Sequence, residues 1–411
     1  MNVPKLRFKE FDGEFRYERT GKFFKYIRNG FVGTATPYYT NETGVKYLQS
    51  NNIKNGEISA HNPIYITREF HNKHKKNELQ LNDLLMVQSG VFTGECAVVN
   101  EEHIGENCHA LIIMTPNNSI NTQYLNYYLH SYQGKKELHR YITGQTIQHI
   151  LSSDMKKIIF PYTQKEEQTK IADFLMLLDK KIQLQQQKID LLQEQKKGFL
   201  QKMFPKNGET VPELRFDGFT GDWKEQKLRE IGKTQSGIGF PDVEQGGSEG
   251  VPFFKVSDMN IAGNEYEMIT SNNYVSDEQL KRKKWRPIET VPAVIFAKVG
   301  AAIMLNRKRL VRTPFLIDNN TMAYVFDESW DTDFGKILFE TVNLPKYAQV
   351  GALPSYNGSD IENIEVKVTN KDEQVKIGLF FNRLEHIINL HQHKLDLLEK
   401  QKKGFMQQMF I

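Results

Sequence analysis

The sequence predicts an α/β (α+β) protein in which two mixed α/β domains are joined by two long helices that form an antiparallel coiled coil. Three observations predict this fold: the chain is an internal duplication, each copy contains a heptad pattern, and the rest of each copy shows short strand patterns separated by turn residues. The predicted segments are a first domain at 1–163, a first repeated helix at 164–204, a linker and second domain at 205–370, and a second repeated helix at 371–411.

Two pairs of segments carry the duplication. Residues 3–15 (VPKLRFKEFDGEF) and 211–223 (VPELRFDGFTGDW) are identical at 7 of 13 positions, and residues 164–204 and 370–410 are identical at 22 of 41. Between these segments only scattered positions agree. A chain that keeps its scaffold twice and varies the surfaces between is expected to recognise two different targets.

Each 41-residue segment predicts one long helix, because apolar residues recur at alternating spacings of four and three. Lys196 and Lys402 interrupt the two seams at matching positions, and a parallel pair would set these like charges against each other. We therefore expect an antiparallel pair with pseudo-two-fold symmetry, in which each lysine lies against apolar residues and extends its amine outward. The alternative is that each helix is amphipathic and packs only on its own domain. The predicted seam residues are Ile171, Leu175, Leu178, Ile182, Ile189, Leu192, Ile377, Phe381, Leu384, Ile388, Leu395 and Leu398.

Period-two patterns and turn residues predict mixed secondary structure in the variable domains. Strands are expected at 64–67, 84–89, 96–99 and 111–114 in the first domain, and at 253–256, 293–298 and 322–326 in the second. Helices are expected at 121–138 and 331–342.

Composition favours a folded protein of the cytoplasm. The 411 residues include only two cysteines, which indicates a reducing compartment, and the first residues lack the apolar core of a signal peptide. The longest apolar stretch, 291–305, is broken by a proline and a lysine and is too short to span a membrane. The net charge of +4 permits a polyanionic partner but does not require one. Whether such a partner is expected therefore depends on how the charged residues cluster.

No pattern of catalytic or metal-binding residues stands out. Gly246–Gly250 matches G-x-S-x-G but is flanked by loop-forming residues instead of a strand and a helix, and the methyltransferase tetrapeptide Asn/Asp-Pro-Pro-Tyr/Phe is absent. Cys96, His103, Cys108 and His109, with His71 and His74, lack the paired spacing of a structural zinc site. We therefore expect no catalytic residues, no metal and no cofactor bound by this chain.

Cationic and aromatic side chains are enriched in both variable domains, as is typical of nucleic-acid binding. Residues 281–286 place five positive charges and a tryptophan together, and glycine-opened polar loops precede a Ser-Asp pair in each copy. A solvated surface or a structural turn is the alternative for each feature. The predicted DNA-binding residues are Lys73, Lys75, Lys76, Gln145, Gln148, Lys281, Lys283, Lys284, Trp285, Arg286, Arg307, Lys308, Arg309, Tyr356 and Asn357.

The whole chain resembles a specificity subunit of a type I restriction-modification system. The resemblance is carried by Val-Pro-x-Leu-Arg-Phe opening each half, the loop running into Ser-Asp before each helix, Glu-Gln-x-Lys-Ile at each helix start and Gln-Lys-Lys-Gly-Phe near each helix end. The second glycine-opened loop departs from the pattern, with Leu353-Pro354 where the first has Thr146 and its neighbour.

The resemblance implies a non-catalytic subunit with two target-recognition domains, each recognising one half of a gapped bipartite site in double-stranded DNA. It implies that two methyltransferase subunits dock on the helices and domains, and that motor-endonuclease subunits join for cleavage. S-adenosylmethionine, ATP and Mg are then expected in those partners. The coiled coil would set the gap between the half-sites.

Two other functions remain open from the residues alone. The chain could be a protein-protein scaffold with two ligand-binding modules and no role in DNA binding. It could also be a nuclease that uses Glu365 and Lys367, although the first copy has Ile159 and Pro161 at the matching positions.

Overall fold

The computed structural model describes residues 2–59, 61–349, 351 and 353–410. It divides into two compact units, one formed by Met1–Gln186 with His393–Ile411 and the other by Gln187–Gln392. Each unit therefore contains one variable domain, the beginning of one long helix and the end of the other. This division cuts across the segments expected from the repeats.

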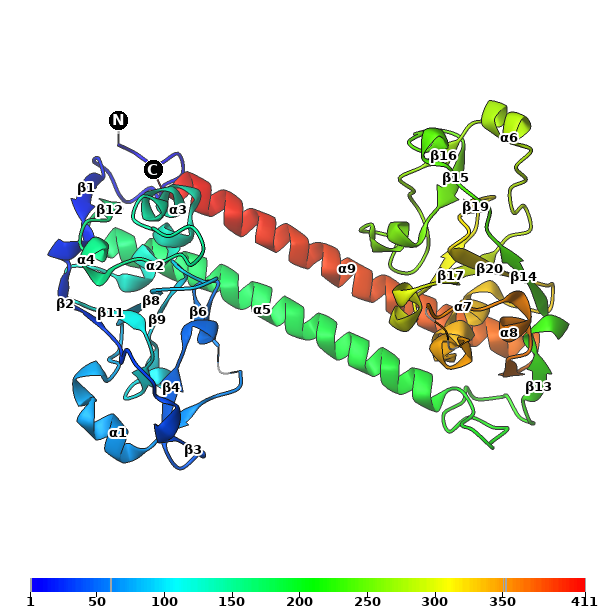
Figure 1. The fold of residues 1–411 in the computed structure, drawn as a ribbon, viewed down its shortest axis with the longest axis horizontal. Coiled ribbons are helices and arrows are strands. Elements are labelled where there is room, and N and C mark those ends of the chain that lie inside the picture. The colour runs from blue at the N-terminus through cyan, green and yellow to red at the C-terminus, as the bar shows by residue number, and fades with distance from the viewer. Residues whose placement is uncertain (1, 60, 350, 352, 411) are drawn as a thin grey trace. The chain divides into compact units, whose positions relative to one another are not determined.

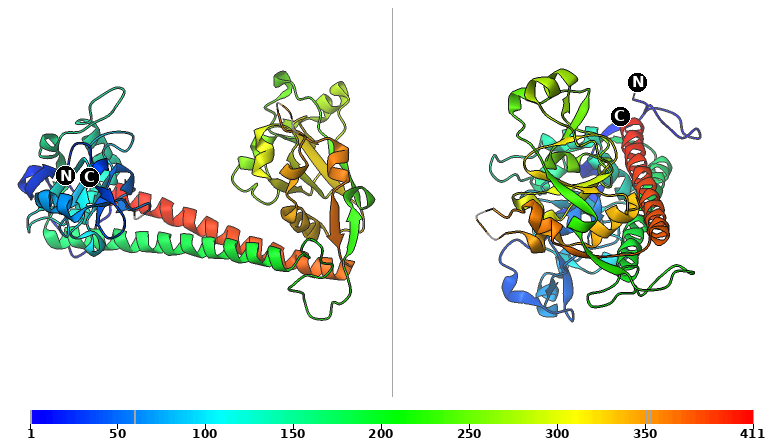
Figure 2. Two further views of the ribbon diagram at one scale, coloured as in Figure 1. Left: turned by 60° about the horizontal axis from the view of Figure 1, so that its bottom comes forward. Right: turned by 90° about the vertical axis from the view of Figure 1, so that its right-hand side faces the viewer.

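The two long helices are α5 (Lys165–Lys202) and α9 (Lys371–Met409), and each carries acidic side chains in its first turn. In the first unit Phe174 of α5 meets Phe405 of α9 with ring centroids 5.0 Å apart. In the second unit Phe199 meets Phe380 at the same separation. Within each unit the helices thus lie side by side in opposite directions (Figures 1 and 2), which confirms the antiparallel coiled coil.

All twelve predicted seam residues are buried or half-buried; Ile182, Leu384 and Leu398 are the half-buried ones. The two seam lysines differ from expectation. Lys196 forms an ion pair with Glu385 at 2.7 Å, and Lys402 forms one with Asp179. Each amine therefore meets a carboxylate of the opposite helix instead of extending past apolar residues into water.

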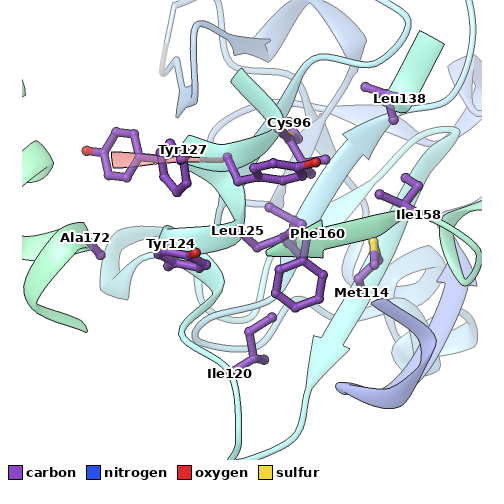
Figure 3. Packing of buried hydrophobic residues seen from close by; sticks show 14 of the residues in the cluster. Cys96, Met114, Ile120, Tyr124, Leu125, Tyr127, Leu138, Ile158, Phe160 and Ala172 are labelled. Carbon is purple, nitrogen blue, oxygen red and sulfur yellow. The ribbon is translucent and has the colours of Figure 1, made fainter. Parts of the chain in front are cut away.

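The first unit is built on an antiparallel sheet in the order β2-β11-β8-β9. Its strands are β2 (Phe24–Asn29), β11 (Leu111–Pro116), β8 (Leu84–Val87) and β9 (Cys96–Val98). One face packs on α2 (Thr122–His130), α3 (Tyr132–His139), α4 (Ser152–Met155) and the long helices, as Figure 3 shows for Tyr124, Leu125 and Met114. Met406 and Met409 at the end of α9 also enter this core, together with Phe410 just after the helix, whose ring lies 5.3 Å from that of Tyr124.

The predicted helix at 121–138 is two helices, because the chain breaks at Ser131. The Ser131 hydroxyl caps α3 by accepting a hydrogen bond from the Gly134 backbone N–H at 3.1 Å. A Cβ on Gly134 would lie 1.9 Å from the Tyr128 carbonyl oxygen, so the glycine permits this close turn.

A smaller sheet lies on the other side of the first unit, in the order β10-β4-β7-β3. Its strands are β10 (Asn107–Cys108), β4 (Val45–Leu48), β7 (Tyr65–Ile66) and β3 (Tyr39–Thr40), and α1 (Arg68–Lys73) follows β7. Two antiparallel strand pairs complete the unit: the hairpin of β5 (Ile53–Lys54) with β6 (Glu57–Ile58), and the long-range pair of β1 (Arg16–Arg19) with β12 (Ile159–Tyr162).

The second unit repeats this plan with different residues. Its main sheet has the order β14-β20-β17-β18, with β14 (Gly232–Ser236), β20 (Thr321–Phe326), β17 (Ala293–Ala297) and β18 (Lys308–Val311). Its small sheet has the order β16-β15-β19, with β16 (Tyr274–Val275), β15 (Val251–Phe254) and β19 (Leu316–Ile317). The remaining elements are α6 (Asp277–Lys283), α7 (Thr332–Thr341), α8 (Gly358–Glu362) and the pair β13 (Lys224–Lys227) with β21 (Glu365–Val368).

Candidate nucleic-acid interface

The two basic runs singled out in the sequence occupy equivalent places in the two units. In each unit a short helix follows a strand of the small sheet, α1 after the inner strand β7 and α6 after the edge strand β16. Figure 1 labels both helices. A hydroxyl caps each helix start: Thr67 accepts from the Phe70 N–H and Ser276 from the Gln279 N–H, both at 3.3 Å. The basic residues gather at the end of each helix, where cations also stabilise the helix dipole.

The exposed members of these runs are free to meet phosphates. Lys73, Lys75, Lys76, Lys281, Lys284 and Arg286 are all exposed. Lys283 is half-buried, because its amine lies 3.1 Å from a carboxylate oxygen of Glu244. The Gln279 amide and the Lys283 amine both hydrogen-bond this carboxylate and lower its pKa. Because Arg282 also pairs with Glu244, at 2.7 Å, the two cations share one carboxylate within the unit.

Trp285 packs within its own unit through part of its ring. Phe240 and Phe253 stack with centroids 3.6 Å apart, and the Trp285 ring meets both of them nearly edge-on. Its half-buried ring therefore holds the end of α6 against the small sheet, and its contact with DNA stays a prediction.

Each glycine-opened loop is hydrogen-bonded to a second loop of its own unit. That second loop follows β8 in the first unit and β17 in the second. In the first unit the Gly90 N–H donates to the Gln148 carbonyl at 3.1 Å, and Gln145 and Gln148 are exposed. In the second unit the Gly300 N–H donates to the Pro354 carbonyl at 2.9 Å. Ala352 of the second loop lies outside the described residues. The two loops thus hold equivalent positions although their sequences differ.

Three predicted contact residues of the second unit face inward. Lys308 is buried on β18, where its amine donates to the Val342 carbonyl at 2.6 Å and burial lowers its pKa to about 8. Tyr356 is 3% exposed, and burial raises the pKa of its hydroxyl. Arg309 is half-buried and burial lowers its pKa. Lys308 and Tyr356 were therefore wrongly assigned to a DNA surface, since neither reaches the solvent.

Two further predicted residues are tied to neighbours. The half-buried Arg307 guanidinium donates to the Asn260 side-chain oxygen. Asn357 is exposed but caps α8, accepting from the Asp360 N–H at 3.0 Å. Both side chains thus have structural partners that a DNA contact would have to share or replace.

The first unit holds a cleft that sequence patterns did not indicate. It has a volume of about 400 Å³ and is lined by residues of two distant segments, 28–32 and 74–77. Arg28, His74 and Lys76 provide polar and charged walls, and Phe31 and Val32 provide apolar ones. Only Lys76 had been predicted, as part of the basic run.

The alternatives with catalytic or metal chemistry gain no support in the described part of the chain. There, no group of three or more His, Cys, Asp or Glu is placed to hold a metal ion. The Lys367 amine donates to the backbone carbonyls of Lys206 and Glu209, and the Glu365 carboxylate lies 3.8 Å from the Lys227 amine. No helix among the described residues is long and apolar enough to cross a membrane.

Comparisons with known proteins agree with this arrangement. Residues 18–194 match the family described as the type I restriction modification DNA specificity domain. The MjaVIII specificity subunit of a type I restriction enzyme from Methanocaldococcus jannaschii is 22% identical, with 97% of this chain and 94% of that protein covered.

Two solved structures share the fold. A type I restriction-modification S subunit from M. genitalium aligns over 100% of this chain and 99% of its own, with a TM-score of 0.64 and 16% identity. A chain from a structure of complex assembly and conformational transition in a type I R-M system aligns over 95% of this chain and 96% of its own, with a TM-score of 0.57 and 13% identity. The similarity therefore extends over the duplicated architecture as a whole.

Proposed function

We infer that this chain belongs to the type I restriction-modification DNA specificity family, and we propose that it is the subunit that recognises the target sequence in double-stranded DNA. One observation carries the proposal. The two units share the strand order of the main sheet and the placement of basic helix ends, yet their residues differ between the repeated segments. Each unit would recognise one half of a gapped site, with phosphates bound by the exposed lysines and base edges by side chains of the variable loops.

The coiled coil would set the gap between the half-sites and dock the methyltransferase subunits. Leu177, Leu184 and Leu191 recur every seven residues along α5 and are 53%, 55% and 48% exposed. Leu390 and Leu397, the counterparts of the last two on α9, are 56% and 46% exposed. A heptad stripe of half-exposed leucines suits an amphipathic helix of a partner, and its occurrence on both helices suits two copies of that partner.

The reactions would take place in the partners. S-adenosylmethionine would bind to the methyltransferase subunits, and ATP and Mg would bind to the motor-endonuclease subunits. This chain would recognise the target sequence in DNA of the cytoplasm.

Methylation mapping tests the proposal. We expect the complex of this chain with a co-expressed methyltransferase subunit of its own system to methylate genomic DNA at a single gapped bipartite motif. A stable complex that leaves genomic DNA unmodified would overturn the proposal and favour a protein scaffold.

The docking stripe is tested with the same complex. Leu184→Asp together with Leu390→Asp should abolish co-purification of the methyltransferase subunit and leave the thermal unfolding of this chain unchanged, because both side chains lie half-exposed on the helix surfaces. Lys188→Asp, at another exposed site on α5, is the control. Retained co-purification of the double variant would place docking elsewhere.

A further inference from the structure

The cleft of the first unit lies where its basic run meets an aromatic cluster. Its 400 Å³ suffices for a flat ring with its attached groups, and His74 and Lys76 from the end of α1 face Phe31 and Val32 from the segment after β2. Val32 is 65% exposed, so one wall is an open apolar edge. Cationic groups beside apolar ones suit a ligand with both an aromatic ring and a negative charge.

His74 is held in a fixed orientation while its ring nitrogens stay available. Its ring packs against those of Phe31 and Phe70, with centroids 4.8 Å and 4.6 Å away, and these two rings are themselves 5.0 Å apart. Within the described residues no hydrogen bond reaches either ring nitrogen. Burial, with the nearby charges of Lys73 and Lys76, lowers the pKa of His74, so at neutral pH the ring offers one donor and one acceptor.

Arg28 holds the backbone of the cleft wall next to His74 in place. Its Nε donates to the Lys76 carbonyl at 3.1 Å, and one Nη donates to the Thr115 hydroxyl at 2.6 Å. The other Nη lies 3.6 Å from the buried Asp83 carboxylate. The backbone of Lys76 is thereby fixed, while its exposed amine forms no ion pair within the described residues.

The second unit has different chemistry at the same place. Counted from the capping residues Thr67 and Ser276, the seventh residue is His74 in the first unit and Lys283 in the second. The Lys283 amine is tied to Glu244, whereas the His74 ring nitrogens have no partner. Equivalent positions at the two helix ends therefore carry different side chains in different bonding states, and only the first unit offers an imidazole there.

We propose that His74 is a specificity-determining residue of the first unit, contacting a base edge of its half-site within this cleft while Lys76 binds an adjacent phosphate. The inference rests on the proposed function and names the part of the first unit that carries it out. A neutral, oriented imidazole can pair with a donor or an acceptor on a base edge, and Phe31 and Val32 can contact a thymine methyl group.

Methylation mapping of variants in the complex with the methyltransferase subunits tests this. His74→Ala should relax one position of one half-site, lowering discrimination there about 5- to 150-fold, and leave the other half-site unchanged. His74→Gln, which keeps hydrogen-bonding groups, should keep discrimination at that position, for the same base or for another, where His74→Ala loses it. Lys76→Ala should lower methylation at all sites alike without relaxing the motif, since a phosphate contact carries no sequence information.

The control is His139→Ala, which removes an exposed histidine of the same unit and should leave the motif intact. An unchanged motif with both His74→Ala and His74→Gln, in complexes that still form, would overturn the inference while the proposed function stands. Saturable binding of free thymidine monophosphate, together with an unchanged motif, would make the cleft a small-ligand site and overturn it too. A wild-type complex that yields no gapped motif would overturn the proposed function itself.

Discussion

The arginine of each repeated N-terminal motif holds a buried glutamate at the start of a long helix. Arg7 Nε lies 2.7 Å from Glu167 in the first unit, and Arg215 Nε lies 2.7 Å from Glu373 in the second. In both pairs a second guanidinium nitrogen donates to the other carboxylate oxygen, at 2.8 Å and 2.7 Å. In each copy, the repeated N-terminal motif supplies the arginine of this ion pair and the repeated helix segment supplies the glutamate. The two repeated segments are therefore in direct contact within each unit.

Removing this arginine should be costly, because each glutamate side chain is 0% exposed. We expect Arg7→Ala to lower the free energy of unfolding of the first unit by about 3–5 kcal/mol, since a buried carboxylate would be left without its charge partner. Chemical denaturation measures this loss, with the exposed Arg16→Ala as the control. A loss equal to that of the control would show that the pair does not secure the fold.

Lys308 makes stability depend on pH. Burial lowers its pKa from 10.5 to about 8, so between these values the unfolded chain keeps a proton that the folded chain has lost. Stability then rises with pH, by at most about 1.4 kcal/mol per unit from this group. Relative to Lys308→Met, the wild type should gain stability as the pH is raised from 8 to 9.5 in urea titrations. Parallel pH profiles of the two proteins would contradict the assignment, and Lys346→Met, an exposed lysine, is the control.

The positions missed at the level of residues share a physical cause. Lys308 belongs to a run of three basic residues but is the first residue of β18. Because a strand directs alternate side chains to opposite faces, Lys308 is buried while the next residue, Arg309, is only half-buried. The cleft at His74 was not predictable from local pattern, because its walls come from segments more than 40 residues apart. Charge clustering located the basic helix ends, but only the fold separates exposed cations from buried ones.

At the level of elements, two matching ion pairs fix how the long helices pair. Lys196 with Glu385 in the second unit corresponds to Lys402 with Asp179 in the first, each residue shifted by the repeat length of 206. The seam lysines that indicated an antiparallel pair thus also define its register, because only one alignment satisfies both amines.

Charge reversal tests that register. Lys196→Glu should lower the free energy of unfolding by about 2 kcal/mol, because two carboxylates would meet in a half-buried seam. Adding Glu385→Lys should restore most of that loss by recreating the pair with its charges exchanged. The double variant is thus compared with each single variant by thermal or chemical denaturation. If the second substitution only added to the loss, the pair would not determine the register.

Elements with strong local periodicity were predictable, and those set by neighbours were not. The heptads located α5 and α9 to within two residues, because their pattern repeats over five turns or more. The break at Ser131 was missed, since it depends on a cap and on the close approach of Gly134 to Tyr128. The strand order of the two sheets also depends on long-range pairing and was not deduced from the sequence.

At the scale of the whole molecule, the proposed function treats the helix pair as a spacer. One heptad inserted into the middle of both α5 and α9 adds about 10 Å of helix and keeps the seam in phase. We expect methylation mapping to find the same two half-sites separated by a longer gap. An unchanged gap in an active complex would mean that the helices do not set the spacing.

The central claim is that each unit carries its own half of the specificity on a shared scaffold. Replacing residues 224–368 by residues 16–162 exchanges the second variable domain for a copy of the first at matching strand boundaries, β13 to β21 for β1 to β12. Methylation mapping of this chain with its methyltransferase subunit is the most direct test. The account predicts a motif built from two inverted copies of the half-site read by the first unit. Retention of the original second half-site would contradict it.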